Sequence, residues 1–136
     1  MLRAIILLVS AFVLATGCSD RNVREASGRA DDFVNAYFSA DFEKASALCT
    51  EDFARRVMES AEIVNGQPDS LLEEFMELAK GMNAYAGEIH QYGRDSVTVD
   101  YEIVYPGEID QPMRNGVLVV RDASTGEWSV AGMTNL

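Results

Sequence analysis

The spacing of apolar residues changes once along this chain, near Gly81, and that change sets the fold class. Before Gly81, apolar residues recur every three or four positions, which is the spacing of one face of an α-helix. After Gly81 they alternate with polar residues, which is the spacing of a strand with one buried face. Helices followed by a run of strands predict an α+β domain, with about three N-terminal helices packed on an antiparallel sheet of about four strands.

Three amphipathic segments are predicted in the first half. The first helix spans about residues 27–40, and Asp41 offers an N-cap to the second. Thr50 can cap a further turn or two. After an Asn-Gly-Gln-Pro break, a capping box over residues 70–73 begins the third helix, and Gly81 is placed for a left-handed C-cap. The apolar positions predicted to be buried are Ala30, Phe33, Val34, Tyr37, Phe38, Phe42, Ala45, Leu48, Cys49, Phe53, Val57, Met58, Leu71, Leu72, Phe75, Met76 and Ala79.

Four strands are predicted in the second half. The clearest covers residues 96–105, and a weaker strand over about residues 84–92 precedes it. Two more are predicted at about residues 113–121 and 127–133, joined by a turn at residues 123–126. In the clearest strand, the face predicted to be buried consists of Val97, Val99, Tyr101, Ile103 and Tyr105. The face predicted to be exposed to solvent consists of Ser96, Thr98, Asp100 and Glu102.

The order of the elements resembles the nuclear-transport-factor-like, or ketosteroid-isomerase-like, cone fold. Residues 31–38 and 41–45 are similar to the family's opening helix, short turn and second helix, and residues 126–130 look like its final strand. The resemblance spans about residues 26–133. It implies a strongly curved sheet, a pocket between helices and sheet, and an outer sheet face through which two copies can pair. The chain looks most like the family's small bacterial lipoproteins of unknown function, some of them lumazine-binding-like.

The chain begins with the features of an export signal. Arg3 is followed by an apolar run from residue 4 to residue 15, broken only by Ser10. This run is shorter than the roughly 20 residues that a membrane-spanning helix needs, and small residues follow it. An ordinary signal peptide would be cleaved near Ala15 or Gly17.

Cys18 favours a lipoprotein signal over an ordinary signal peptide, because small residues followed by Cys resemble the bacterial lipobox. The resemblance implies cleavage before Cys18 and acylation of that residue, and two or more acyl chains hold a protein stably on a membrane. We therefore expect a signal peptide over residues 1–17, the lipidated Cys with a flexible tether over 18–25, and the folded domain over 26–136. The location expected is the bacterial cell envelope. The residue after the Cys is Ser19. An Asp at this position would resemble an inner-membrane retention signal, so Ser favours the outer membrane.

The net charge limits the classes of molecule that the chain can bind, and the number of cysteines limits its disulfide bonds. The formal net charge is −11 at pH 7, which argues against nucleic acid as a partner and against electrostatic binding to anionic lipid. A solvated acidic surface explains this charge, and a cationic partner is the alternative. With Cys18 lipidated, Cys49 has no partner for a disulfide. Its place on an apolar helix face predicts a buried, unreactive thiol.

The sequence offers no complete catalytic or metal-binding set, so it predicts no catalytic residue, no cofactor and no metal ligand. His90, the only His, lies two residues from Glu88 on one strand face, and no second His accompanies it. We interpret it as a surface His beside a carboxylate. General acid–base catalysis in a pocket would need a carboxylate as the base and a phenol to polarise a carbonyl group. The candidates are Tyr37, Tyr85, Tyr101 and Tyr105 with Asp100 or Glu102, but the tyrosines have core spacing and the carboxylates lie on the wet face.

Two functions of different classes are consistent with this sequence. The first is a non-enzymatic binding module, anchored at the envelope, that captures a small apolar molecule or docks to a neighbouring protein. The alternative is an isomerase- or dehydratase-type enzyme that acts on a hydrophobic substrate. An ionisable group aimed into a closed pocket would favour the enzyme. A cavity filled by apolar side chains would exclude it.

Overall fold

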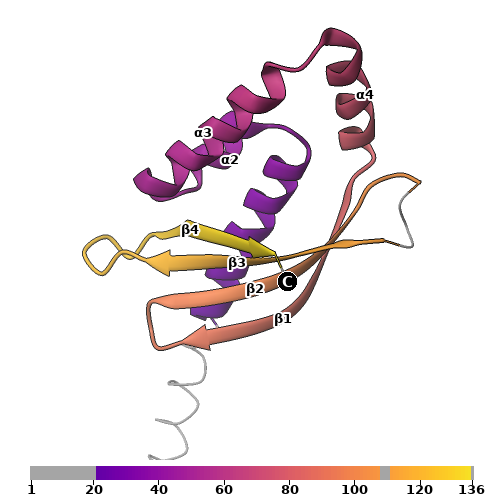
Figure 1. Cartoon of the computed structure of the whole chain (residues 1–136). Helices are drawn as coiled ribbons and strands as arrows, with labels where there is room; N and C mark the ends of the chain where they lie inside the picture. Colours follow the sequence, from indigo (N-terminus) through magenta and orange to yellow (C-terminus); the bar gives the residue numbers. More distant parts are fainter. Residues whose placement is uncertain (1–20, 108–110, 136) are drawn as a thin grey trace, which may run out of the picture.

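The computed structural model describes residues 21–107 and 111–135, with helices in the first half and strands in the second (Figure 1). The signal peptide, Cys18 and Ser19 therefore lie outside the described residues. The elements are a helix over residues 21–38, α2 (Phe42–Ala47), α3 (Glu51–Asn65), α4 (Asp69–Lys80), β1 (Asn83–Tyr92), β2 (Ser96–Val104), β3 (Met113–Arg121) and β4 (Trp128–Asn135). The predicted α+β class is confirmed, with four helices in the described part rather than three.

The four strands form one antiparallel sheet in the order β1-β2-β3-β4, so each strand pairs with its neighbour in sequence. Val99 of β2 lies opposite Val117 of β3, and Val119 of β3 lies opposite Val130 of β4. These valines are fully buried. The period-2 alternation therefore aligns one apolar face across β2, β3 and β4, and this face receives the helices.

The core lies between this sheet face and the helices that precede it. Phe33 stands at its centre, with its ring centroid 5.6 Å from that of Tyr37 and 5.7 Å from that of Phe53. Tyr37 also meets Phe42 edge to face, with 5.5 Å between centroids. Aromatic pairs of this kind add to the free energy gained by burial. The helical residues buried in this core are Ala26, Ala30, Phe33, Val34, Ala36, Phe38, Phe42, Ala45, Phe53, Val57 and Ala61.

The link between α2 and α3 is attached to the last strand. The Thr50 N–H donates to the Val130 carbonyl over 2.9 Å, and the Val130 N–H donates to the Leu48 carbonyl, also over 2.9 Å. Cys49 thereby forms a single parallel bridge with Val130. Thr50 also caps α3, because its side chain accepts a hydrogen bond from the Phe53 N–H, as predicted. This junction fixes the start of α3 on the edge of the sheet.

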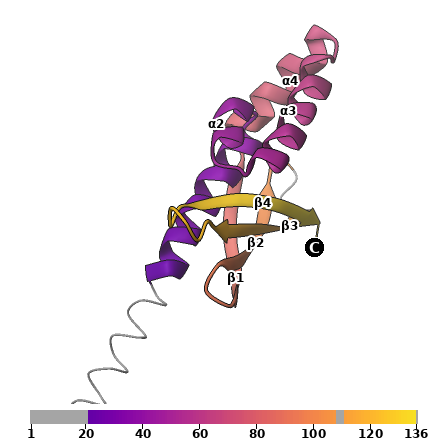
Figure 2. The same cartoon turned by 90° about the vertical axis from the view of Figure 1, so that its left-hand side faces the viewer.

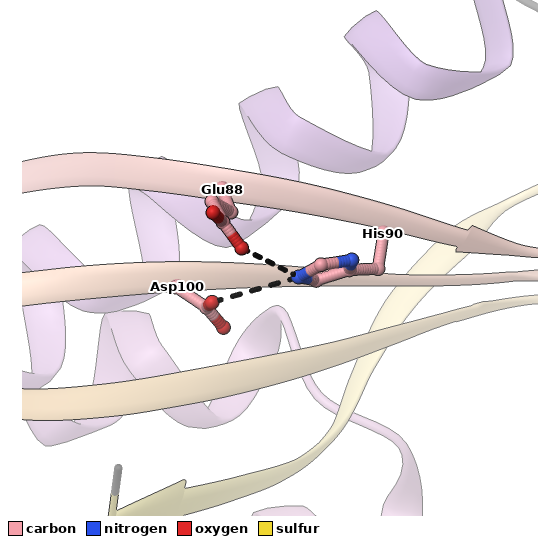
Figure 3. Close-up of side chains that lie close together, drawn as sticks. All are labelled: Glu88, His90 and Asp100. Carbon is pink, nitrogen blue, oxygen red and sulfur yellow. Dashed lines mark ion pairs between the residues drawn. The ribbon is translucent and has the colours of Figure 1, made fainter.

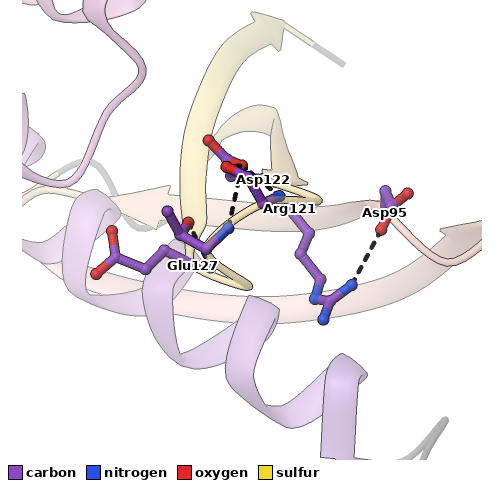
Figure 4. Close-up of polar contacts among 6 residues, drawn as sticks. Asp95, Arg121, Asp122 and Glu127 are labelled. Carbon is purple, nitrogen blue, oxygen red and sulfur yellow. Dashed lines mark hydrogen bonds and ion pairs between the residues drawn. The ribbon is translucent and has the colours of Figure 1, made fainter.

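Two turns are tied together at one end of the sheet (Figure 4). The Arg121 N–H donates to the Asp95 carbonyl over 2.8 Å, and the Arg121 guanidinium lies 3.4 Å from the Asp95 carboxylate. In the β3–β4 hairpin, the Asp122 N–H donates to the Glu127 carbonyl over 2.9 Å. Hydrogen bonds from the Ser124 hydroxyl and N–H hold the pKa of Asp122 below its usual value. The turn predicted at residues 123–126 is thus confirmed.

The first helix begins earlier than predicted. Residues 21–25, expected to belong to the tether, are helical. The Arg21 guanidinium lies 3.1 Å from the Glu25 carboxylate, an i,i+4 ion pair that supports a helix. Ala26, on the next turn, is fully buried against the core. Packing of this turn extends the helix into a segment whose polar composition indicated a tether.

α4 differs most from its prediction. The capping box over residues 70–73 is wrong, because the N-cap is Pro68 and no side-chain hydrogen bond caps the helix. Gly81 is the C-cap, but with φ −96° and ψ 8° it is not left-handed. Gly is needed there for another reason, since a Cβ on Gly81 would lie 2.5 Å from Cγ of Pro106. Of the five positions predicted to be buried on α4, only Ala79 is buried.

Figures 1 and 2 show why α4 is exposed. In both views α3 leads away from the sheet, and α4 returns from its far end toward the start of β1 without lying on the sheet face that receives the other helices. Met58, on α3, was also predicted to be buried, yet it is 41% exposed.

No helix in residues 21–107 and 111–135 combines the length and the hydropathy needed to cross a membrane.

Candidate functional site

The α3–α4 pair presents an apolar surface that the described chain leaves uncovered. We call this surface the arm face and define it by Ile63, Leu71, Leu72, Phe75 and Met76. Ile63 is 68% and Leu71 51% exposed, and Met76 is also exposed. Leu72 and Phe75 are half-buried. Large apolar side chains that gather in this way on one surface are typical of a contact site.

A shallow groove runs between α3 and α4, and we call these two helices together the arm. It has a volume of about 310 Å³, and its walls are almost entirely apolar. Because α3 and α4 meet at the Asn65–Pro68 break, apolar residues from the end of α3 face those from the start of α4. The residues that line the groove are Ile63, Val64, Gln67, Leu71, Leu72 and Phe75.

The two helices that carry the arm face, α3 and α4, have more carboxylates than cations. The acidic residues of α3 and α4 are Glu51, Asp52, Glu59, Glu62, Asp69, Glu73, Glu74 and Glu77, against the cations Arg55, Arg56 and Lys80. Two of these cations are paired within the arm, Lys80 with Glu77 over 2.8 Å and Arg55 with Asp52. A larger open depression, of about 880 Å³, lies on α4 and is lined by Glu73, Glu74 and Glu77 among others. The arm is therefore apolar in its groove and acidic around it.

The phenols considered for acid–base work do not form a catalytic set. The Tyr37 hydroxyl donates to Ser60 Oγ over 3.3 Å, and the Tyr105 hydroxyl donates to the Phe38 carbonyl over 2.9 Å. Tyr85 is 58% exposed, so its prediction as a core residue is wrong. The predicted faces of β2 are confirmed, since Tyr101 and Ile103 are buried and Glu102 is exposed.

Tyr101 makes the most consequential polar contact of the core. The residue is only 3% exposed, and its hydroxyl donates to the Asp31 carboxylate, which lies on the exposed side of the first helix. Burial, and then the hydrogen bond to Asp31, raise the pKa of Tyr101 far above its ordinary value. The phenol therefore stays protonated and joins the first helix to β2. Sequence spacing placed Tyr101 in the core but gave no sign of Asp31 as its partner.

Cys49 is half-buried rather than fully buried. Its Sγ lies 3.2 Å from the Ala45 carbonyl, to which the thiol donates. Burial raises the pKa of the Cys49 thiol to about 12. A thiol of this pKa is protonated at neutral pH, which agrees with the unreactive Cys predicted from the sequence.

A second cluster lies on the face of the sheet opposite the core (Figure 3). His90 Nε2 lies 3.3 Å from a Glu88 carboxylate oxygen, and the two residues share one strand face, as predicted. Nε2 also lies 3.7 Å from a carboxylate oxygen of Asp100, on β2. The neighbouring Glu102 does not join the cluster and lies 3.4 Å from the Arg114 guanidinium.

The sequence analysis treated Asp100 and His90 separately, and the structure brings them together through a β-bulge. Ala86 lies opposite Tyr101, and Ile89 lies opposite Val99. Two residues of β1, Gly87 and Glu88, therefore oppose the single residue Asp100. Gly87, a Gly within an otherwise regular strand pattern, is the sequence signal that could have indicated this bulge.

Comparison with known proteins gives little further information. No protein-family model matches the chain, and no curated protein is similar to it. Among solved structures, the chain is similar to a ketosteroid isomerase-like protein from Erwinia carotovora atroseptica. The two sequences are 16% identical, and the match covers 84% of this chain and 95% of that one, with a TM-score of 0.45. With identity and TM-score this low, the match says nothing about what this chain binds or catalyses.

Proposed function

We propose that this chain is a lipid-anchored, non-enzymatic binding module of the bacterial cell envelope that docks to a neighbouring protein through the arm face. The observation that carries this proposal is the exposed apolar surface of α3 and α4, where Ile63, Leu71 and Met76 face solvent. The anchor part rests on Cys18 and the small residues that precede it. With Ser19 after the Cys, the location proposed is the outer membrane.

Burial of the arm face would be favourable by roughly 25 cal/mol for each Å² of apolar surface removed from water. The arm face repeats at the spacing of a helix surface, which is the pattern by which helices dock into partner grooves. Several large side chains would be covered together in one contact. Such a contact matches the central apolar patch of a protein–protein interface.

The chemistry of the arm favours a protein with a specific composition. An apolar ridge of the partner would fill the groove, and Lys or Arg residues beside that ridge would meet the carboxylates of α3 and α4. A small apolar ligand is favoured less, because the groove is at the low end of the volumes of ligand pockets, about 300–1,000 Å³. The enzyme alternative lacks support among the described phenols, since Tyr101 is committed to Asp31 and Tyr37 to Ser60.

Photo-crosslinking in the native bacterium tests both parts of the proposal. A photo-reactive amino acid replaces Leu71 in the full chain, and the control places it at Tyr92, an exposed residue of β1. We expect one discrete adduct from position 71, in the membrane fraction, and none from position 92. Cys18→Ser should release the chain from the membrane and remove the adduct.

The adduct identifies the occupant. An envelope protein with a basic contact surface, whose adduct weakens as salt is raised, supports the proposal. An adduct between two copies of this chain would replace it with a homodimer. Equal adducts from positions 71 and 92, or none from either, would exclude docking through the arm face. A Cys18→Ser chain that stays in the membrane fraction would exclude the lipid anchor.

A further inference from the structure

We propose that Glu88, His90 and Asp100 form a binding site for a divalent transition-metal ion, with Zn²⁺ as the favoured ion. The site lies on the outer sheet face, away from the arm face, and is independent of the docking function. One imidazole nitrogen and one oxygen from each of the two carboxylates lie within 4.8 Å of one another. Imidazole and carboxylate groups are ligands that Zn²⁺ accepts in proteins.

The separations between these atoms match those of ligands on one ion. Zn–N and Zn–O bonds are about 2.1 Å long, so two ligands of a tetrahedral site lie about 3.4 Å apart. His90 Nε2 lies 3.3 Å from the Glu88 oxygen and 3.7 Å from the Asp100 oxygen. In Figure 3 the two carboxylates approach the same imidazole nitrogen from two strands. Small rotations of exposed side chains would suffice to place all three atoms around an ion.

The bulge in β1 is what aims these side chains at one another. With Gly87 and Glu88 together opposite Asp100, the alternation of β1 shifts by one residue. Glu88 and His90 then lie on the outer face, beside Asp100, rather than on the core face. A Cβ on Gly87 would lie 3.5 Å from the Asp100 carbonyl, which is an ordinary van der Waals contact. Bulges often re-aim side chains near functional sites.

The surroundings leave room for the rest of a coordination shell. Asp100 lies opposite Gly116 on β3, and both residues line a shallow hollow of about 560 Å³ beside His90. Gly132 and one cation, Arg56 of α3, also line this hollow. Water could complete the coordination from this side. The two carboxylates would balance the charge of the ion. The imidazole favours zinc and similar ions over Mg²⁺, which prefers oxygen ligands alone.

The only His of the chain provides a direct readout. The purified full chain, without a polyhistidine tag and with both cysteines replaced by Ala, is titrated with Zn²⁺ while the His90 imidazole signals are followed by NMR. We expect a saturable shift of these signals with one ion per chain. Mg²⁺ at the same concentration should leave them unshifted.

Three variants separate a metal site from general attraction to an acidic surface. Glu88→Gln and Asp100→Asn should each weaken Zn²⁺ binding by about tenfold or more, since each removes a charged ligand. Glu102→Gln is the matched control, because it removes a carboxylate of the same face that pairs with Arg114. It should leave the affinity within about twofold, since Glu102 is not one of the three ligands. Circular dichroism confirms that each variant is folded.

Two results would overturn the proposal. One is the absence of a saturable shift of the His90 signals with Zn²⁺. The other is a Glu102→Gln variant that loses as much affinity as Asp100→Asn, because binding would then follow the charge of the surface rather than the three ligands.

Discussion

Ala40 lies in the left-handed region of the backbone map, with φ 67°, just after the helix over residues 21–38. The Asp41 N–H donates to the Ala36 carbonyl over 2.8 Å, and the Ala40 N–H donates to the Tyr37 carbonyl over 3.1 Å. These two bonds form the Schellman motif, in which Gly is the usual residue at this position. A side chain with a Cβ is therefore held in a strained conformation where the first helix turns toward α2.

The first residue-scale prediction follows from this strain. Ala40→Gly should raise the free energy of unfolding by about 1 kcal/mol, because Gly adopts a positive φ without a steric penalty. Ala54→Gly, the same substitution inside α3, should lower it by about 1 kcal/mol. Urea unfolding of both variants gives the two values. A loss of stability in both would show that Ala40 is not strained.

The second residue-scale prediction concerns Tyr101 at high pH. Since the folded pKa of Tyr101 is raised, its contribution to stability is complete below the unfolded value of about 10 and is lost as pH rises above it. Tyr101→Phe should lower the free energy of unfolding by about 1 kcal/mol at pH 7, through the lost bond to Asp31. Above pH 10 its stability should fall less steeply than that of the unchanged chain.

Urea unfolding between pH 7 and pH 11.5 measures these slopes. Cys49 needs a control, because its pKa is also raised, to about 12, and it too makes stability fall as pH rises. Cys49→Ala, introduced both with and without Tyr101→Phe, removes this contribution from the comparison. Parallel stability curves for these two chains above pH 10 would contradict a protonated, buried phenol.

At the scale of elements, α4 shows the limit of a periodic pattern. Its apolar residues have the correct helical spacing, and a helix did form from Asp69 to Lys80. The spacing predicts that one face will be covered, but it does not say by what. Because α3 leads away from the sheet, the domain's own core cannot reach Leu71 or Met76. A pattern that predicted burial therefore became the arm face.

At the scale of elements, replacing Gly81 or Gly28 by Ala should change the free energy of unfolding in opposite directions. Gly81→Ala should lower the free energy of unfolding by about 1–3 kcal/mol, because its Cβ would lie 2.5 Å from Cγ of the rigid Pro106 ring. Gly28→Ala, in the first helix, meets nothing within 4 Å and should raise it by about 1 kcal/mol through helix propensity. Thermal unfolding distinguishes the two. Equal effects would mean that the α4–β1 junction adapts to a side chain.

The bounds of the strands were predicted more accurately than the side-chain contacts between elements. β3 has the predicted bounds, Met113–Arg121, because its alternation ends at marked turns. The approach of Asp100 to His90 depended on the extra residue in β1, and a shift of one residue moves every side chain to the other face. Likewise, the pairing of Tyr101 with Asp31 joins two elements that no local spacing relates. Local patterns therefore predicted the elements, and tertiary packing decided the contacts.

At the scale of the whole molecule, the change of period near Gly81 was sufficient to predict helices packed on an antiparallel meander. What the sequence did not indicate is that the molecule has two separate exposed surfaces, the arm face on α3–α4 and the cluster around His90 on the outer sheet face. Both arise from how the elements are placed after they form. A partner on the arm face would therefore leave His90 accessible.

The attachment of Leu48 and Thr50 to Val130 also governs when the chain can fold. The start of α3 has its backbone partners on the last strand, so the helical half is incomplete until the C-terminal residues are present. Contacts between such distant parts of a chain form late and slow its folding. A nascent chain that emerges N-terminus first would stay open until its end arrives. For a protein proposed to be exported to the cell envelope, that delay would keep the polypeptide unfolded during export.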